Sequence, residues 1–84
     1  MSAENVRVAK EAATALKALS GSDRDAAFRA LGVIAGNPIV GAPLFEPLRG
    51  FWVLREGRVR IVYRVSRDGS MAGVVLVDVV EEES

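Results

Sequence analysis

The dipeptide Glu56-Gly57 constrains the fold of this chain more than any other feature. It lies between two runs rich in β-branched, aromatic and aliphatic residues, 48–55 and 58–65. A glycine between two such runs is a strong short-range signal for a β-hairpin, because glycine readily adopts the positive φ that tight turns use. The sequence therefore predicts two antiparallel strands joined by a two-residue turn at Glu56-Gly57.

The predicted turn also sets which side chains share a face of the hairpin. With Glu56 and Gly57 as the turn residues, Leu54 pairs with Val59 and Trp52 with Ile61. Because side chains alternate along a strand, the residues separate onto two faces. One face is almost wholly apolar and is expected to pack against helices: Trp52, Leu54, Val59, Ile61, Tyr63 and Val65. The other face combines four arginines, Arg55, Arg58, Arg60 and Arg64, with the apolar residues Phe51, Val53 and Val62.

Arginines gathered on one face predict an anionic partner, since like charges opposite each other destabilise a sheet. Residues 48–67 hold six arginines and one acid, an excess of 6 − 1 = +5 in a chain of zero formal net charge. Acid is concentrated at the other end of the chain, at Asp78 and residues 81–83. We expect either this acidic end or an acidic partner segment to occupy the arginines, in mutual exclusion; the plainer interpretation is a solvated terminus.

Length and composition narrow the class of protein. With 84 residues, half of them hydrophobic, the chain has room for one small domain, 1–84, with a single core. It has no Cys and no His, which excludes disulfides, thiolate or imidazole metal sites, and catalysis that depends on these side chains. We expect no metal and no cofactor. Its apolar runs are too short for a spanning helix, so a cytoplasmic protein without a membrane partner is expected.

The first half of the chain has helical periodicity. From about Ala9 apolar residues recur at helical spacing, and Gly21 is predicted to end this helix. Ser22 is the predicted N-cap of a second helix that runs through 26–35. The short connection predicts two antiparallel helices. Asn5–Val8 is interpreted either as a short strand or as the first turn of the helix that follows.

The second half switches to strand periodicity. A loop with three prolines, 37–47, links the helices to the hairpin and is expected to lack regular structure. After the hairpin comes a continuously apolar run, 73–80, which predicts a strand buried on both faces. The fold class is therefore α+β, with an N-terminal αα-hairpin, alone or after a short strand, packed on a three- to four-stranded antiparallel sheet.

The order of elements and a set of spaced residues resemble the RelE/ParE superfamily of toxins from type II toxin–antitoxin systems. The resemblance extends from about Leu16 to Val80. Its most specific part is the block of Leu-Arg, one residue, Gly, two residues, Arg, two residues, Tyr. The residues that carry it are Asn37-Pro38, Gly41, Leu44, Leu48, Gly50, Trp52-Val53-Leu54-Arg55, Gly57 and Arg60-Ile61-Val62-Tyr63.

The resemblance implies a RelE/ParE-like fold, a cognate antitoxin that wraps the toxin, and one of two activities. In the RelE branch the toxin is a metal-independent endoribonuclease, an mRNA interferase that cleaves translated mRNA on the ribosome. In the ParE branch the toxin poisons a protein target, gyrase. A third reading is a degenerate homologue that binds only its antitoxin or a second copy of itself.

The same resemblance suggests site residues. Arg60 matches the central sheet arginine of the family and Arg55 the arginine that ends the preceding strand, so both are predicted catalytic residues. Independently of the resemblance, Arg58 and Arg64 of the arginine face and Lys10 of the first helix are the predicted substrate-binding residues. The chain departs from the ribonuclease pattern in having Phe51 and Val53 where lysines are frequent, and an acidic C-terminal segment in place of a basic, aromatic one.

Three other residues are assigned from their place in the predicted strands. Tyr63 is either a catalytic acid or stacking platform, or a core residue with its hydroxyl at the rim; its place on the apolar face favours the core. Trp52 is assigned to the core for the same reason. Asp78 interrupts an apolar strand, and a carboxylate there needs a partner, for which an arginine of the neighbouring strand would serve.

Overall fold

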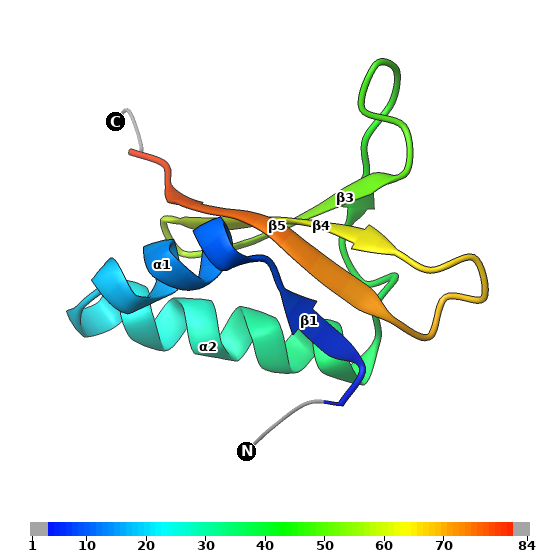
Figure 1. Ribbon diagram of the computed structural model, residues 1–84. Coiled ribbons are helices and arrows are strands. Elements are labelled where there is room, and N and C mark those ends of the chain that lie inside the picture. The colour runs from blue at the N-terminus through cyan, green and yellow to red at the C-terminus, as the bar shows by residue number, and fades with distance from the viewer. Residues whose placement is uncertain (1–3, 82–84) are drawn as a thin grey trace.

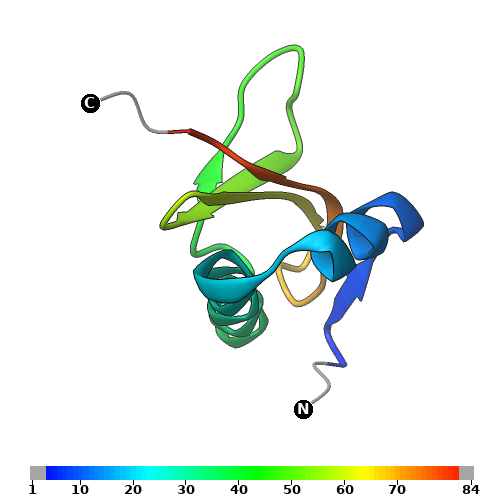
Figure 2. The same cartoon turned by 90° about the vertical axis from the view of Figure 1, so that its left-hand side faces the viewer.

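The computed structural model describes residues 4–81, which form one sheet with two helices on one of its faces (Figures 1 and 2). In the sheet the strand order is β1-β5-β4-β3-β2, and β1 alone runs parallel to its neighbour. This is the predicted α+β class. The elements in chain order are β1 (Val6–Val8), α1 (Lys10–Ala18), α2 (Gly21–Gly36), β2 (Ala42–Pro43), β3 (Phe51–Glu56), β4 (Val59–Val65) and β5 (Ala72–Val79).

The helices run in opposite directions beneath the sheet, as predicted (Figure 1). The break between them comes earlier than expected, at Leu19-Ser20, so Ser20 is the N-cap residue and Gly21 begins α2. Gly21 has φ +58°, a conformation that glycine adopts without steric cost, and this lets the chain reverse within two residues. The assignments of Gly21 as a helix end and of Ser22 as the cap were therefore wrong.

The hairpin turn lies one residue further along the chain than predicted. Glu56 pairs with Val59 and Trp52 pairs with Tyr63, which makes Gly57-Arg58 the two-residue turn. Gly57 has φ +58° at the first turn position, where type II′ turns require glycine. The partner of each residue moves by two positions, from Ile61 to Tyr63 for Trp52. Because side chains alternate with period two, the strand residues keep their predicted faces although the predicted pairs are wrong, and Arg58 leaves its predicted face for the turn.

The core lies between the apolar face of the hairpin and α2. On β4 the side chains of Val59, Ile61 and Tyr63 are fully buried, while α2 contributes small side chains and one large one, Ala26, Ala27, Ala30 and Ile34. Alanines allow the helix backbone to lie close to the sheet. Trp52 is half-buried and packs against this cluster, which confirms its assignment to the core.

Two short strands complete the sheet, and only one of them, β2, goes beyond the predicted three to four strands. Residues Val6–Val8 form β1, parallel to β5, so the strand interpretation of this segment is confirmed. Within the proline-rich segment, Ala42–Pro43 form β2, antiparallel to β3 at the sheet edge. Proline is tolerated at an edge because its missing N–H needs no partner there. The sheet thus has five strands.

The last strand is not buried on both faces. β5 has a register irregularity opposite Val62/Tyr63, and Val75 and Leu76 are 37% and 44% exposed. Val74 and Val77 do lie in the core. The prediction that this strand is buried on both faces was wrong. Both helices cover the same face of the sheet, and no other element of residues 4–81 covers the opposite face (Figure 1).

Gly41, just before β2, lies directly against the backbone of β3 and the side chain of Tyr63. Its N–H donates a hydrogen bond to the Tyr63 hydroxyl at 3.0 Å. A Cβ built on Gly41 would lie 2.5 Å from the Val53 carbonyl oxygen and 2.6 Å from the Tyr63 hydroxyl. The backbone oxygen has no freedom to move away, so no side chain fits at position 41.

We therefore expect Gly41→Ala to lower the free energy of unfolding by about 1–3 kcal/mol through overpacking. Gly32→Ala is the matched control, since Gly32 is inside α2 with nothing within 4 Å of an added Cβ. This substitution should stabilise by about 0.5–1 kcal/mol through helix propensity. Urea unfolding of the two variants measures both effects, and equal stabilities would refute the close approach.

Candidate functional site

The candidate site is the face of the sheet turned away from the helices, which we call the open face. On its three long strands, opposite residues form rows across β3, β4 and β5. Charged rows lie on either side of an aliphatic one. The rows are Arg55–Arg60–Asp78, Val53–Val62–Leu76 and Phe51–Arg64–Gly73.

The structure brings the two predicted catalytic residues together. Arg55 and Arg60 are directly opposite partners on adjacent strands. On its other side Arg60 faces Asp78, and its Nε and one Nη donate hydrogen bonds to the two carboxylate oxygens at 3.0 and 2.5 Å. This carboxylate, through its hydrogen bonds and its charge, raises the pKa of the Arg60 guanidinium. The expected arginine partner of Asp78 is thereby confirmed.

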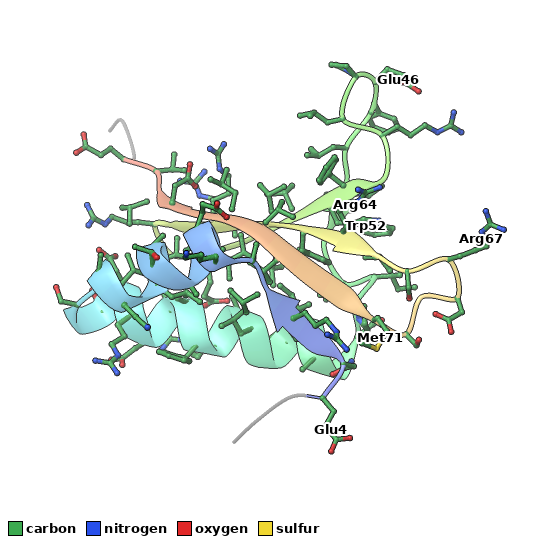
Figure 3. All side chains as sticks on the ribbon, in the orientation of Figure 1. Glu4, Glu46, Trp52, Arg64, Arg67 and Met71 are labelled. Atoms are coloured by element: carbon green, nitrogen blue, oxygen red, sulfur yellow. The ribbon has the colours of Figure 1, made fainter. Side chains whose placement is uncertain are left out.

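Arg64 lies at the other end of the open face. Its guanidinium carbon is 5.1 Å from the centre of the Phe51 ring, its cross-strand partner, in a cation–π contact. The side chain remains exposed, and Figure 3 shows it on the side of the sheet away from the helices. A flat guanidinium over an aromatic ring is a surface on which a nucleobase or another planar group stacks.

Arg58 does not share the open face with the other arginines, contrary to the prediction. It is a turn residue, and its Nε and Nη donate to the carboxylate of Asp23, in the first turn of α2, at 3.3 and 2.7 Å. Its carbonyl accepts a hydrogen bond from the N–H of Val80 at 2.7 Å. Arg58 therefore ties the hairpin turn to the helix layer and to the end of β5.

Lys10 is also away from the arginine rows. It is the first residue of α1, in the helix layer, and it is exposed. Its carbonyl accepts a hydrogen bond from the Thr14 hydroxyl. The structure thus separates the predicted site residues into Arg55, Arg60 and Arg64 on the open face and Arg58 and Lys10 elsewhere.

Tyr63 is a core residue, as its place on the apolar face predicted. It is fully buried, and its hydroxyl accepts the hydrogen bond from Gly41. Burial raises the pKa of this hydroxyl, so it stays protonated at neutral pH. A buried, bonded hydroxyl is unavailable to a substrate on the open face.

A protruding loop, residues 44–50, was not anticipated as part of the site. It connects β2 to β3 and projects on the same side of the sheet as the open face (Figures 1 and 2), with Glu46 at its far end (Figure 3). Phe45 is 83% exposed and Leu48 51%. A cavity of about 380 Å³ lies there, lined by Pro43, Leu44, Phe45, Glu46, Arg49 and Gly50. In the sequence, the feature that pointed to this part of the site was the presence of apolar residues within a proline-rich loop.

Three further expectations concern the acidic end of the chain, a metal site and a membrane. Glu82, Glu83 and Ser84 lie outside the described residues, so the idea that the acidic end occupies the arginines stays a prediction. Between residues 4 and 81 no group of three or more acidic, Cys or His side chains is placed to hold a metal ion. Neither helix in this range combines the length and the hydrophobicity needed to cross a membrane.

Comparison with known proteins gives matches among solved structures. A chain of the toxin–antitoxin complex RelBE2 from Mycobacterium tuberculosis is similar over 93% of this chain and 92% of its own, with 28% identity and a TM-score of 0.80. The isolated RelE toxin of E. coli matches with 16% identity, 93% and 85% coverage and a TM-score of 0.75. The RelE–RelB complex of Pyrococcus horikoshii matches with 13% identity, 98% and 100% coverage and a TM-score of 0.71. No protein-family model and no curated protein matches the sequence.

Two carboxylates with lowered pKa values give the fold an acid-sensitive stability. Hydrogen bonds from Arg58 lower the pKa of Asp23, and bonds from Ser70 and Ser66 lower that of Asp68 to about 2, from an ordinary 3.8. A carboxylate whose pKa is lower in the folded state than in the unfolded state stabilises the fold at any pH above its unfolded-state pKa. This contribution is lost as the pH falls through the pKa of the folded state. The free energy of unfolding should therefore decrease between pH 4 and pH 2. In urea titrations, a D23N/D68N double variant should lose less stability than the parent over this window; an equally steep loss would contradict the assignment.

Proposed function

Since the chain belongs by its fold to the RelE/ParE superfamily of toxins, we propose that it is the toxin of a type II toxin–antitoxin module and that it acts on translated mRNA. The observation that carries the proposal is the pair Arg55 and Arg60, directly opposite each other on the open face. Guanidinium groups form bidentate, charge-assisted hydrogen bonds with phosphate. The face therefore offers a site for an RNA backbone.

The proposed chemistry needs no metal. When the 2′-hydroxyl of RNA attacks the adjacent phosphate, negative charge builds on the non-bridging oxygens of a pentacoordinate phosphorane, and the two arginines stabilise that charge. The P–O5′ bond then breaks, which leaves a 2′,3′-cyclic phosphate on one fragment and a 5′-hydroxyl on the other. Arg64 over Phe51 lies four residues along β4 from Arg60, about 13 Å away at 3.3 Å per residue, and would hold a neighbouring base. The chain has no His and its one Tyr is buried, so neither of these side chains serves in proton transfer.

An antitoxin is the proposed protein partner. The matching structures from M. tuberculosis and P. horikoshii are toxin–antitoxin complexes. On this chain the open face combines cationic rows with an aliphatic row in which Leu76 is 44% exposed. An acidic, partly apolar segment is complementary to such a surface.

A second candidate is a toxin that binds a protein target such as gyrase, or a degenerate homologue that binds only its antitoxin. Two observations favour it: Asp78 already neutralises Arg60, and Phe45 and Leu48 are exposed on the protruding loop. Exposed apolar residues are typical of protein contacts rather than of ribosome contacts, which use basic surfaces. Primer extension on mRNA from induced cells separates the candidates, because only the first leaves new cleavage ends within translated codons.

We expect induced expression in a bacterial host without a cognate antitoxin to slow growth. Arg60→Ala should abolish the effect with little change in the thermal midpoint, because a half-exposed ion pair contributes only about 0–1 kcal/mol. Arg24→Ala is the matched control, since Arg24 is an exposed arginine of α2 outside the open face. Normal growth with soluble parent protein, or equal loss of toxicity in both variants, would refute the proposed site.

A further inference from the structure

The described part of the chain contains two bidentate Arg–Asp pairs, and they lie in different places. The pair of Arg58 with Asp23 joins the hairpin turn to α2. The pair of Arg60 with Asp78 lies on the open face, between adjacent strands. In the second pair the carboxylate occupies Nε and one Nη of Arg60. These are nitrogens with which a guanidinium forms its fork of two parallel bonds to a phosphate.

The row Arg55–Arg60–Asp78 accounts for the location of this carboxylate. Arg55 and Arg60 are opposite each other, and like charges in that position repel. Asp78 faces Arg60 from the other neighbouring strand and reduces the charge of the row from +2 to +1. The carboxylate therefore stabilises the sheet and at the same time occupies the Nε and Nη side of the Arg60 guanidinium.

We propose that Asp78 is an internal competitor for Arg60, and that a phosphate engages this arginine fully only by replacing the carboxylate. The inference rests on the proposed role of the open face in binding RNA, and it assigns to Asp78 the control of its affinity. The exchange is feasible because the two side chains are 43% and 36% exposed, so water solvates the displaced carboxylate. Asp78 thereby weakens binding of polyanions that cannot complete the exchange.

The test is binding of a fluorescently labelled single-stranded RNA oligonucleotide to the full chain at about 50 mM salt, where phosphate contacts are strong. Asp78→Asn should tighten binding about 2- to 5-fold, the factor that corresponds to releasing one exposed ion pair. The slope of log K against log salt should steepen by about 0.7, the value for one further phosphate contact on a single strand. Asp78→Thr, which suits a strand, should act in the same direction.

Asp23→Asn is the matched control, because it makes the same change of charge at the other Arg–Asp pair. If it tightens binding as much as Asp78→Asn, net charge alone explains the effect and the proposal fails. Arg60→Gln adds a second criterion: it should cost more affinity in the Asp78→Asn background than in the parent. Equal costs in the two backgrounds, or unchanged affinity in both Asp78 variants at preserved thermal midpoints, would overturn the proposal.

This measurement is independent of growth inhibition. If the parent chain binds the oligonucleotide and Asp78→Asn tightens binding, but expression does not slow growth, the toxin function fails and the competition stands. If expression is toxic and Asp78→Asn leaves binding unchanged, the competition fails and the function stands.

Discussion

Burial of one face of β4 against α2 is the interaction on which the rest of the structure depends. Val59, Ile61 and Tyr63 are fully buried there, and fully burying an aliphatic or aromatic side chain contributes about 1.5–3 kcal/mol. On α2 the contact surface is built mainly of alanines, which bring the helix close enough to exclude water. Because side chains alternate along a strand, this burial forces Arg60, Val62 and Arg64 to the opposite side. The candidate site is thus a geometric consequence of the core.

The open face combines features that are each costly in an isolated domain. Arginines lie opposite each other on β3 and β4, and aliphatic residues of β5 are exposed beside them. The chain offsets part of this cost internally, with Asp78 against Arg60 and the Phe51 ring against Arg64. What remains is a surface of cations and apolar groups that suits an anionic partner with some hydrophobic character.

The two Arg–Asp pairs show how the same chemistry serves two purposes. Arg58 and Asp23 join the hairpin turn to the helix layer, where their loss would loosen the contact between layers. Arg60 and Asp78 lie within one layer and face solvent, so their pair contributes little to stability. Its effect falls instead on what the open face binds. Position in the fold, rather than the type of bond, separates the structural pair from the functional one.

The residue pattern by itself determined the fold class, the hairpin, the identity of its two faces, the core positions of Tyr63 and Trp52, and an arginine as the partner of Asp78. These follow from periodicity and from charge, which are local or nearly local properties. The pattern left β1 open between a strand and a helical turn, and the tertiary structure chose the strand. Tertiary structure alone decided the turn at Gly57-Arg58, the start of α2 at Gly21, the edge strand β2, and the exposure of Val75 and Leu76 on β5. It also moved Arg58 to the helix layer and separated Lys10 from the arginine rows. Each of these depends on contacts between distant segments: an apolar run does not show which of its faces a helix will cover, and an arginine beside a turn does not show which carboxylate the fold will bring to it.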